Sequence, residues 1–286
     1  MTKACVFILY NPDIEVVITN INSIKKDVDF IYLIDNSDTN QSYEKLFRSE
    51  NSIRYINLNG NKGIARALNI GFKQAKEDGV EWVLTMDQDS VIPDNMISKY
   101  SGFIKSGNEA NIGIITPQIN VYKGESRDVV EIISSEVLCY TSGSFTSVDA
   151  WEKVGGFKEY LFIDFVDFEF CLDLITNNYK IFKLHSVVMN HELGKTREYR
   201  FWGKHLFYVT NHNYIRRYYM TRNMRYVREM YGNQFPGLSE FNGGWRSVWV
   251  ICKILLFEKD KLRKLRSIYE GIRDYKLGIT GKYIRQ

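Results

Sequence analysis

The stretch WVLTMDQDS, residues 82–90, is an apolar run that ends in two carboxylates one residue apart, Asp87 and Asp89. The apolar part is typical of a buried β-strand. Two neighbouring acids repel each other and are costly to remove from water, so a positive partner is expected at the end of this strand. A solvated surface turn rich in Asp is the alternative interpretation.

Three earlier runs, at 4–10, 30–38 and 53–59, repeat the pattern of an apolar strand followed by polar residues. Before the run at 81–87, Ile64, Leu68, Phe72 and Ala75 have the spacing of one helix face. Alternating strands and helices predict a parallel sheet with right-handed crossovers, which binds ligands at the carboxyl ends of its strands. These ends carry Tyr10-Asn11, Asp35-Asn36-Ser37-Asp38, Asn59-Gly60-Asn61-Lys62-Gly63 and Asp87-Gln88-Asp89.

The later chain is less regular. Strand patterns at 111–117, 129–138 and 180–190 and helical patterns at 147–155 and 166–177 predict a mixed sheet. Beyond residue 200 the pattern is read as helical, and Gln234-Phe235-Pro236-Gly237 is the expected boundary. The predicted fold is α/β, with a mixed, mainly parallel central sheet flanked by helices in a domain 1–234 and a helical extension 235–286.

Composition sets the class of protein. The chain has 286 residues, 44% of them hydrophobic and 25% charged, which are ordinary values for a globular protein. Its four cysteines are widely spaced, so neither a disulfide framework nor a zinc site is expected. The apolar run in the first ten residues is too short for the core of a signal peptide, which favours a cytoplasmic protein.

Oxygen ligands such as Asp87 and Asp89 suit hard divalent cations, Mg²⁺ or Mn²⁺, which commonly bridge carboxylates to substrate phosphates. The turn NGNKGIA, residues 59–65, is either a phosphate cradle at a helix N-terminus or a plain helix entry. Asp35 is either a turn residue or a carboxylate that binds a base or ribose. These alternatives stay open on the residues alone.

The order and spacing of several segments resemble those of inverting family 2 glycosyltransferases of the GT-A fold, and among them bacterial rhamnosyltransferases of polysaccharide assembly. The resemblance covers roughly residues 4–230. The segments are IDNSD, NKGIARALNIG, LTMDQDS, SGSF, GGFKEYLFIDFVDFEFCLD and HELG.

The resemblance implies roles for the residues at the strand ends. Tyr10, Asn11 and Asp35 would hold the base and ribose of a nucleotide-sugar, and Asp87 would face the ribose. Asn36, Lys62 and Gln88 would also lie at the donor. Asp89 and His191 would be the protein ligands of Mn²⁺ or Mg²⁺. From the residues alone, a single His after a strand is more often a satisfied structural residue than a ligand.

Four acids, Asp164, Asp167, Glu169 and Asp173, follow one another at helical spacing. They form either a solvated acidic face or a site where a carboxylate removes a proton from an acceptor hydroxyl. The resemblance matches Asp167 to the general base, whereas the family usually has Arg where this chain has Asp173. Candidates for the acceptor pocket are Trp151, Phe162 and Asp164, and core packing is the alternative for the aromatic residues, including Phe157.

The chain from 245 to 286 holds eleven Lys or Arg against four Asp or Glu, whereas the whole chain has a net charge of only +4. An apolar helical face is followed by KDKLRKLR, residues 259–266, which indicates an interfacial helix beside a basic patch on an anionic membrane surface. The segment is too short to span a bilayer. The alternatives are packing on the catalytic domain or a homodimer contact, and no nucleic-acid-binding module is recognised. The apolar face comprises Trp245, Val248, Trp249, Ile251, Cys252, Leu255 and Leu256.

Together these features predict a metal-dependent enzyme that transfers L-rhamnose from dTDP-rhamnose, with inversion, to a saccharide or lipid-linked saccharide in bacterial polysaccharide synthesis. A UDP-sugar-dependent hexosyl- or galactofuranosyltransferase is the rival within the family. A sugar nucleotidyltransferase would need a Gly-rich loop with Arg and Lys after the first strand, where this chain reads LYNPDIE. A non-catalytic nucleotide-binding protein is the third alternative. The expected location is the cytoplasm, including the inner face of the cell membrane.

Overall fold

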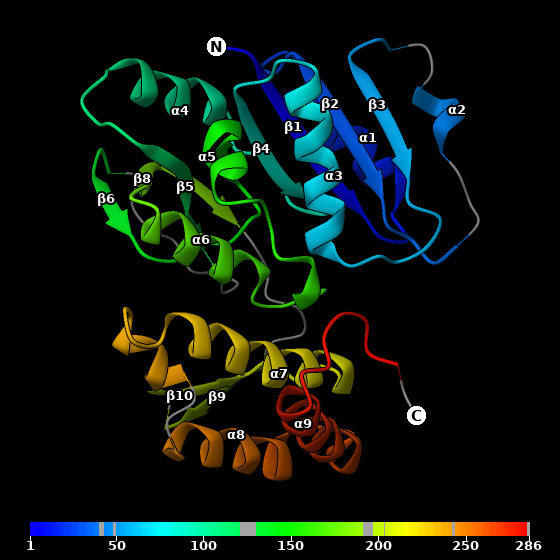
Figure 1. Ribbon diagram of the computed structural model, residues 1–286, viewed down its shortest axis with the longest axis vertical. Helices are drawn as coiled ribbons and strands as arrows, with labels where there is room; N and C mark the ends of the chain where they lie inside the picture. Colours follow the sequence, from blue (N-terminus) through cyan, green and yellow to red (C-terminus); the bar gives the residue numbers. More distant parts are fainter. Residues whose placement is uncertain are drawn as a thin grey trace. The chain divides into compact units, whose positions relative to one another are not determined.

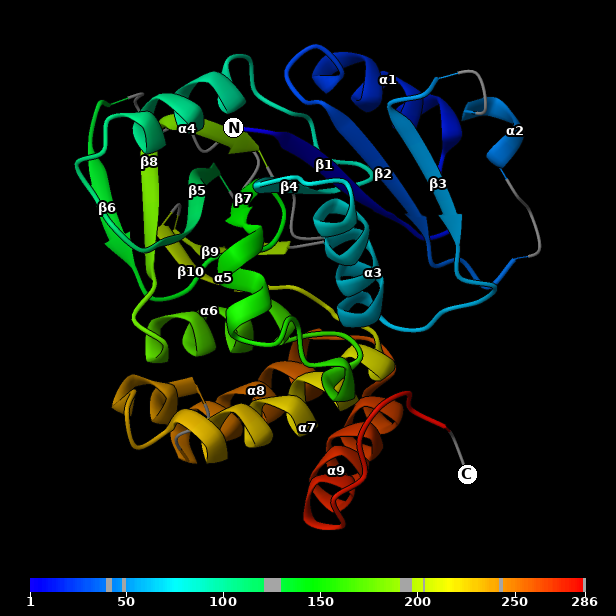
Figure 2. The same cartoon turned by 45° about the horizontal axis from the view of Figure 1, so that its top comes forward.

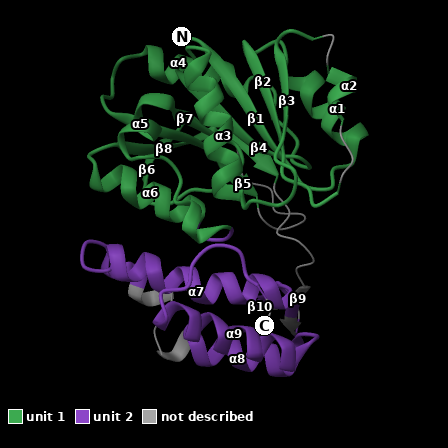
Figure 3. Cartoon of the chain, turned by 45° about the vertical axis from the view of Figure 1, so that its right-hand side comes forward, with its two compact units in different colours: residues 1–162, 166–191 green, residues 163–165, 192–286 purple. Residues whose placement is uncertain are grey.

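The computed structural model describes residues 1–39, 43–47, 50–120, 130–190, 197–202, 204–241 and 244–284. The chain divides into two compact units, residues 1–162 with 166–191 and residues 163–165 with 192–286 (Figure 3). The boundary expected at 234/235 lies inside the second unit.

The first unit is built on an eight-stranded sheet in the order β3-β2-β1-β4-β7-β5-β8-β6 (Figure 1). The strands expected from the apolar runs are present, and the short β7 joins them. Their bounds are β1 Lys3–Leu9, β2 Phe30–Asp35, β3 Ile53–Asn57, β4 Trp82–Asp87, β5 Ile112–Asn120, β6 Ile133–Glu136, β7 Ser144–Ser147 and β8 Lys180–Asn190.

The sheet is mixed and mostly parallel. β1 pairs in parallel with both β2 and β4, β2 pairs with β3, and β5 pairs with β8, whereas β7 runs antiparallel between β4 and β5 and β6 runs antiparallel to β8. The chain winds outward from β1 through β2 to β3 and then returns to β4 on the other side of β1. The carboxyl ends of β1 and β4 therefore form a topological switch point, the place where open α/β sheets bind ligands.

Helices cover both faces of this sheet (Figures 1 and 2). Cys5, Phe7 and Leu9 of β1 belong to the core cluster that includes buried residues of α1 and α4. The helix α3 lies on the opposite face. The helices of this unit are α1 Ile14–Ile24, α2 Glu44–Phe47, α3 Ile64–Glu77, α4 Met96–Lys105, α5 Val148–Lys153, the short η1 Glu159–Leu161 and α6 Val166–Thr176.

The helix α3 approaches the sheet closely because Gly71 has no side chain. A Cβ built at Gly71 would lie 2.7 Å from Cγ1 and 3.0 Å from Cγ2 of Val6 on β1. Ile34 of β2 lies on the same side, 3.5 Å from that position. This close packing sets the distance between α3 and the sheet. It therefore also positions the turn that leads from β3 into the helix.

In its described residues, the second unit contains three long helices and a β-hairpin. Its elements are β9 Arg197–Phe201, β10 Lys204–Val209, α7 Tyr214–Tyr231, the short η2 Pro236–Phe241, α8 Gly244–Phe257 and α9 Lys261–Lys276. The helical interpretation beyond residue 200 is wrong at its start, because residues 204–209 form a strand that pairs antiparallel with β9. Phe207 of this strand stacks on Tyr199 of β9 and packs edge-on against Phe257 of α8. The apolar residues of this segment therefore pack a β-hairpin against α8.

Charged side chains are buried inside the second unit. Glu258 is 4% exposed and accepts from Arg217 at 2.6 Å and from Lys264 at 2.8 Å. Arg222 is fully buried, donates to the carbonyl oxygen of Gly281 at 2.9 Å, and lies over the ring of Tyr218. Each buried charge thus has partners, as burial in a low dielectric requires.

No helix within the described part of the chain is both long enough and apolar enough to cross a membrane.

The close approach at Gly71 predicts a difference between two Gly→Ala variants. Gly71→Ala forces a methyl group against Val6, whereas Gly102→Ala on α4 meets no atom within 4 Å. Both variants gain helix propensity, so we expect Gly71→Ala to be less stable than Gly102→Ala by about 1–3 kcal/mol in urea unfolding. Equal stability of the two variants would contradict the close packing of α3.

Candidate active site

The switch point is closed by a reciprocal contact between β1 and β4. The backbone N–H of Tyr10 donates to Oε1 of Gln88 at 2.8 Å, and Nε2 of Gln88 donates to the carbonyl oxygen of Tyr10 at 3.3 Å. Asn20 on α1 holds the backbone of Gln88 through a 3.0 Å bond to its carbonyl oxygen. Gln88 therefore joins the ends of the two strands and fixes the position of the two acids beside it.

Asp35, at the end of β2, is turned into the protein and is 1% exposed. Its Oδ1 accepts from the backbone N–H of Ser37 at 2.9 Å, and its Oδ2 accepts a short bond from the hydroxyl of Tyr55 on β3. The side-chain oxygen of Ser37 in turn accepts from the backbone N–H of Asn11 at 2.7 Å. These contacts place the Asp35 carboxyl at the turn after β2, and its binding to a base or ribose stays a prediction.

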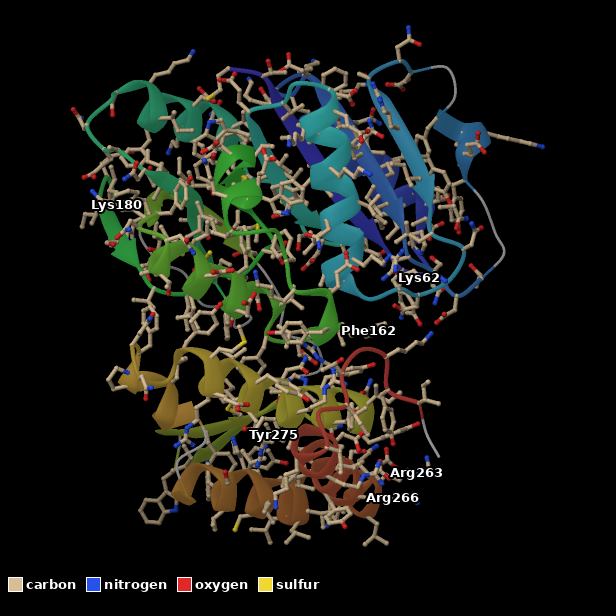
Figure 4. The ribbon with its side chains drawn as sticks, in the orientation of Figure 1. Lys62, Phe162, Lys180, Arg263, Arg266 and Tyr275 are labelled. Atoms are coloured by element: carbon tan, nitrogen blue, oxygen red, sulfur yellow. The ribbon has the colours of Figure 1, made fainter. Side chains whose placement is uncertain are left out.

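Asn36 joins the ends of β2 and β3. Its Oδ1 accepts from the backbone N–H of Lys62 at 2.7 Å, and its Nδ2 donates to Oδ1 of Asn61 at 3.3 Å. The Lys62 side chain is exposed, on the loop before α3 (Figure 4). Gly63 follows it with φ +90°, and a Cβ there would lie 2.7 Å from the carbonyl oxygen of Phe162. Only glycine fits this entry to α3 without strain.

Asp38, for which the sequence predicts no particular role, lies among the residues at these strand ends. It is exposed, accepts from the hydroxyl of Tyr10 at 3.0 Å, and accepts from the backbone N–H of Asn61 at 3.1 Å. The hydrogen bond to Asp38 is the main cause that raises the pKa of Tyr10 above its ordinary value. Its place in the polar run after β2 is the only sequence signal, because the contact joins three separate loops.

The two acids that open the sequence analysis lie at the end of β4. Asp87 is half-buried, and its backbone N–H donates to Oγ of Ser142 at 3.2 Å. Asp89 is exposed. The predicted partner ligand, His191, lies outside the described residues, and within the described ranges no three His, Cys, Asp or Glu side chains are grouped to hold a metal.

Asp167 stands in the first turn of α6, where a negative charge is favoured by the helix N-terminus. It is half-buried, its Oδ1 accepts from the backbone N–H of Phe168 at 2.9 Å, and its side chain lines a small pocket. The other lining residues come from β5, the segment before β7, β7 itself, Phe157 and α6: Ile114, Cys139, Tyr140, Thr141, Ser144, Thr146, Phe157, Phe170 and Cys171.

The segment 139–144 connects the acids of β4 with α6. Ser142 contacts the backbone of Asp87, while the thiols of Cys139 and Cys171 lie 3.5 Å apart. Gly143 donates its backbone N–H to the carbonyl oxygen of Thr85 on β4 at 2.8 Å. One short segment thus touches both the strand that ends in Asp87 and the helix that carries Asp167. The cysteines are free, as expected, and all but the half-buried Cys252 are buried.

The aromatic candidates for the acceptor pocket make packing contacts. Trp151 on α5 stacks on Phe72 with ring centroids 5.4 Å apart and donates to Oδ1 of Asn69 at 3.1 Å. Phe162 is buried against the entry of α3 in a left-handed conformation, with φ +69°. Neither lines the pocket beside Asp167, whereas Phe157 does.

Asp164 belongs to the second unit by its contacts. Its Oδ1 accepts from both Nε and Nη2 of Arg216, at 3.1 and 2.9 Å, and its Oδ2 is buried without a hydrogen-bond partner among the described residues. Its backbone is left-handed, with φ +60°, and the amide of Asn223 binds its carbonyl oxygen. Burial raises the pKa of the Asp164 carboxyl, and Arg216 opposes that shift.

Of the two other acids in this region, Asp173 forms an ion pair and Glu169 is buried. Asp173 pairs with Lys158 at 2.7 Å, so a lysine from the loop before η1 balances the acid that stands where the family usually has arginine. Glu169 is fully buried on α6. Of the four acids in this run, Asp167 alone lines the pocket described above.

The fold and the polar strand ends define an open α/β protein of the class that binds ligands at the switch point of its sheet. Residues 5–162 match the family model described as glycosyl transferase family 2. The chain belongs to glycosyl transferase family 2 and is a glycosyltransferase of the GT-A fold.

Individual relatives agree with this assignment. The chain is 27% identical over 290 residues to the dTDP-rhamnosyl transferase RfbF of Shigella flexneri, covering 96% of each protein. It is similar in fold to S. aureus TarS 1–349, with a TM-score of 0.58, 14% identity, and coverage of 100% of this chain and 93% of that one. GalNAc-T7, solved with UDP, GalNAc and Mn²⁺, gives a TM-score of 0.62 at 13% identity, covering 98% of this chain and 57% of that one.

The buried bond between Tyr55 and Asp35 predicts a stability difference between two Tyr→Phe variants. Tyr55→Phe removes a donor from a buried carboxylate and should lower the free energy of unfolding by about 1.5–3 kcal/mol. The matched control is Tyr179→Phe, whose hydroxyl donates to the exposed Asp149 at 3.1 Å. We expect its effect to stay within about 0.5 kcal/mol in the same urea unfolding experiment. Equal effects would show that Asp35 does not depend on Tyr55.

Proposed function

We propose that this glycosyltransferase moves L-rhamnose from dTDP-rhamnose to a saccharide or lipid-linked saccharide of bacterial polysaccharide synthesis, with inversion at the anomeric carbon. The observation that carries the proposal is the similarity to the dTDP-rhamnosyl transferase RfbF over 96% of both chains. The joined ends of β1, β2, β3 and β4 support it, because a nucleotide diphosphate needs polar groups from several loops at one edge of a sheet.

The donor is proposed to bind across these strand ends. Tyr10 is 45% exposed and offers an aromatic face beside Asn11, which suits a nucleotide base. Asn36 and Gln88 hold the loops in place, and the exposed Lys62 supplies a positive charge for phosphate oxygens. Asp35 is proposed to hold the base or ribose together with Tyr10 and Asn11. The residues proposed for the donor, the acceptor and the metal all lie within 1–234, which we propose as the catalytic domain.

The acids after β4 fit a divalent cation. Asp89 is exposed and offers hard oxygen donors, and one or two carboxylates plus the diphosphate of a donor are a usual ligand set for Mg²⁺ or Mn²⁺. Asp87 is proposed to face the ribose. With His191 as the second protein ligand, the ion would stabilise negative charge on the departing diphosphate. GalNAc-T7, which shares the fold, is solved with Mn²⁺.

Asp167 is proposed as the general base. The acceptor hydroxyl oxygen forms a bond to the anomeric carbon as the bond to the diphosphate breaks, and the hydroxyl proton passes to the Asp167 carboxylate. Asp167 is half-buried and lies in the first turn of α6, next to the small pocket that it lines. The helix N-terminus favours its charged form before the reaction.

The donor assignment is tested by calorimetry with dTDP, UDP and GDP, each with Mn²⁺, with Mg²⁺ and with excess EDTA. We expect dTDP with a metal to bind tightest, and EDTA or Asp89→Ala to weaken this binding, because Asp87 and Asp89 repel each other without a cation. Preference for UDP would instead favour the UDP-sugar alternative, which the solved complex of S. aureus TarS with UDP-GlcNAc illustrates for this fold. Unchanged binding in EDTA would remove the metal from the proposal.

The role of Asp167 is tested by comparing amide variants of the acids. Asp167→Asn should keep donor and metal affinity while lowering kcat by about 10²-fold to 10⁴-fold, because a base acts only in the transition state. Asp89→Asn should weaken donor binding as well. Product formation from dTDP-rhamnose and calorimetry with dTDP separate these two effects.

Asp173→Asn is the matched control on the same helix, since it removes a carboxylate that pairs with Lys158. It should change kcat far less than Asp167→Asn, and so should Asp164→Asn and Glu169→Gln. Near-normal turnover of Asp167→Asn together with an inactive Asp164→Asn would assign the base to Asp164 instead.

A further inference from the structure

We propose that the outward side of α8 binds the surface of an anionic lipid bilayer. This inference deepens the proposed function, on which it rests only for the statement that the acceptor is lipid-linked. The surface has two parts. The α8 apolar face comprises Val248, Trp249, Ile251, Leu255 and Leu256, and the α9 basic edge comprises Lys259, Lys261, Arg263 and Arg266.

The α8 apolar face is exposed although every member is apolar. Val248 is 52% exposed and Leu256 is 67% exposed, and the other three members are at least 36% exposed. Spacings of one, three and four residues place all five on one side of the helix. A continuous apolar helix face that stays in water marks an interaction site.

The opposite side of α8 already has its partners. Ile254 is fully buried, and Phe257 packs against Tyr199 of β9 and Phe207 of β10, with ring centroids 4.8 and 5.1 Å apart. Trp249 touches Phe207 edge-on at 5.4 Å and is still 45% exposed. The core of the second unit therefore uses the inner side of α8 and leaves the outer side for another partner.

Positively charged residues follow α8 directly in the chain, and α9, which carries most of them, contacts α8. The four residues of the α9 basic edge are exposed, and Figure 4 shows Arg263 and Arg266 extending from α9. Arg266 forms an ion pair with Glu270, with Nε and Oε1 2.6 Å apart, so its charge is partly balanced. Lys264, which the sequence pattern includes in the basic patch, is buried on Glu258 and does not contribute.

An anionic bilayer fits both parts at once, because it offers apolar chains beneath negative headgroups. A 14-residue helix is about 21 Å long, so α8 is suited to lie in the interface. A second copy of the chain fits less well. A two-fold contact through α8 would bring two basic edges toward each other, and like charges oppose such a contact.

The experiment measures flotation of the full chain with vesicles of phosphatidylcholine alone or mixed with phosphatidylglycerol. We expect binding to the anionic vesicles at low salt and release at high salt. Leu255→Glu/Leu256→Glu should lower the vesicle partition coefficient by about tenfold or more, since two apolar anchors are lost. Lys261→Glu/Arg263→Glu should lower it to a similar extent, about tenfold, for anionic vesicles.

Matched controls use residues that are equally exposed in the first unit. Leu46→Glu on α2 and Lys25→Glu/Lys26→Glu at the end of α1 should leave vesicle binding unchanged. Thermal unfolding and calorimetry with dTDP show whether each variant is folded. Leu256→Glu alone, at the most exposed position of the face, keeps the test valid if the double variant unfolds.

Absence of wild-type binding to anionic vesicles overturns the proposal, and so does unchanged binding of the folded α8 and α9 variants. A dimer in light scattering that Leu255→Glu/Leu256→Glu converts to monomers, without vesicle binding, would assign the face to a second copy. If the protein binds anionic vesicles but does not bind dTDP, the proposed membrane-binding surface stands and the proposed dTDP-linked donor is wrong.

Discussion

The parallel pairing of β1 with both β2 and β4 is the constraint on which the first unit depends. Because crossovers between parallel strands return the chain to the same edge of the sheet, the residues that follow these strands lie together at that edge. Gln88 then locks the β1 and β4 ends through the backbone of Tyr10, and Asn36 locks the β2 and β3 ends through Lys62. Close packing at Gly71 holds α3 against the same strands.

The strand ends of the first unit carry negative charge where the proposed donor, which is also negative, would bind. Asp38, Asp87 and Asp89 bring several carboxylates to the strand ends, whereas the diphosphate of a nucleotide-sugar is itself negative. In the proposed function, Lys62 and a divalent cation reconcile the two, because a cation is attracted to both. The buried Asp35 differs from these acids, because the hydroxyl of Tyr55 and the backbone N–H of Ser37 donate to its two oxygens.

The second unit distributes polar and apolar residues unusually. Lys264, Arg217 and Arg222 are buried with partners, while Leu256 and Val248 remain in water. Buried charges cost desolvation energy that their partners offset, and exposed apolar residues lose the gain of burial. The exposed apolar residues of α8 are explained if this outer helix face has another partner, and we propose a bilayer as that partner.

The sequence alone determined the strands of the first unit other than β7, together with the α3 helix and the polar strand ends, because apolar periodicity and turn residues are local signals. The order of the motifs also predicts roles for Asp87, Asp89 and Asp167, which stay predictions. Only the tertiary structure decided which polar residues meet: Asp38 with Tyr10 and Asn61, Ser142 with Asp87, and Lys158 with Asp173. Tertiary packing likewise made residues 204–209 a strand and buried Lys264, because contacts far along the chain override the local pattern: Phe207 packs against Phe257, and Lys264 donates to Asn211.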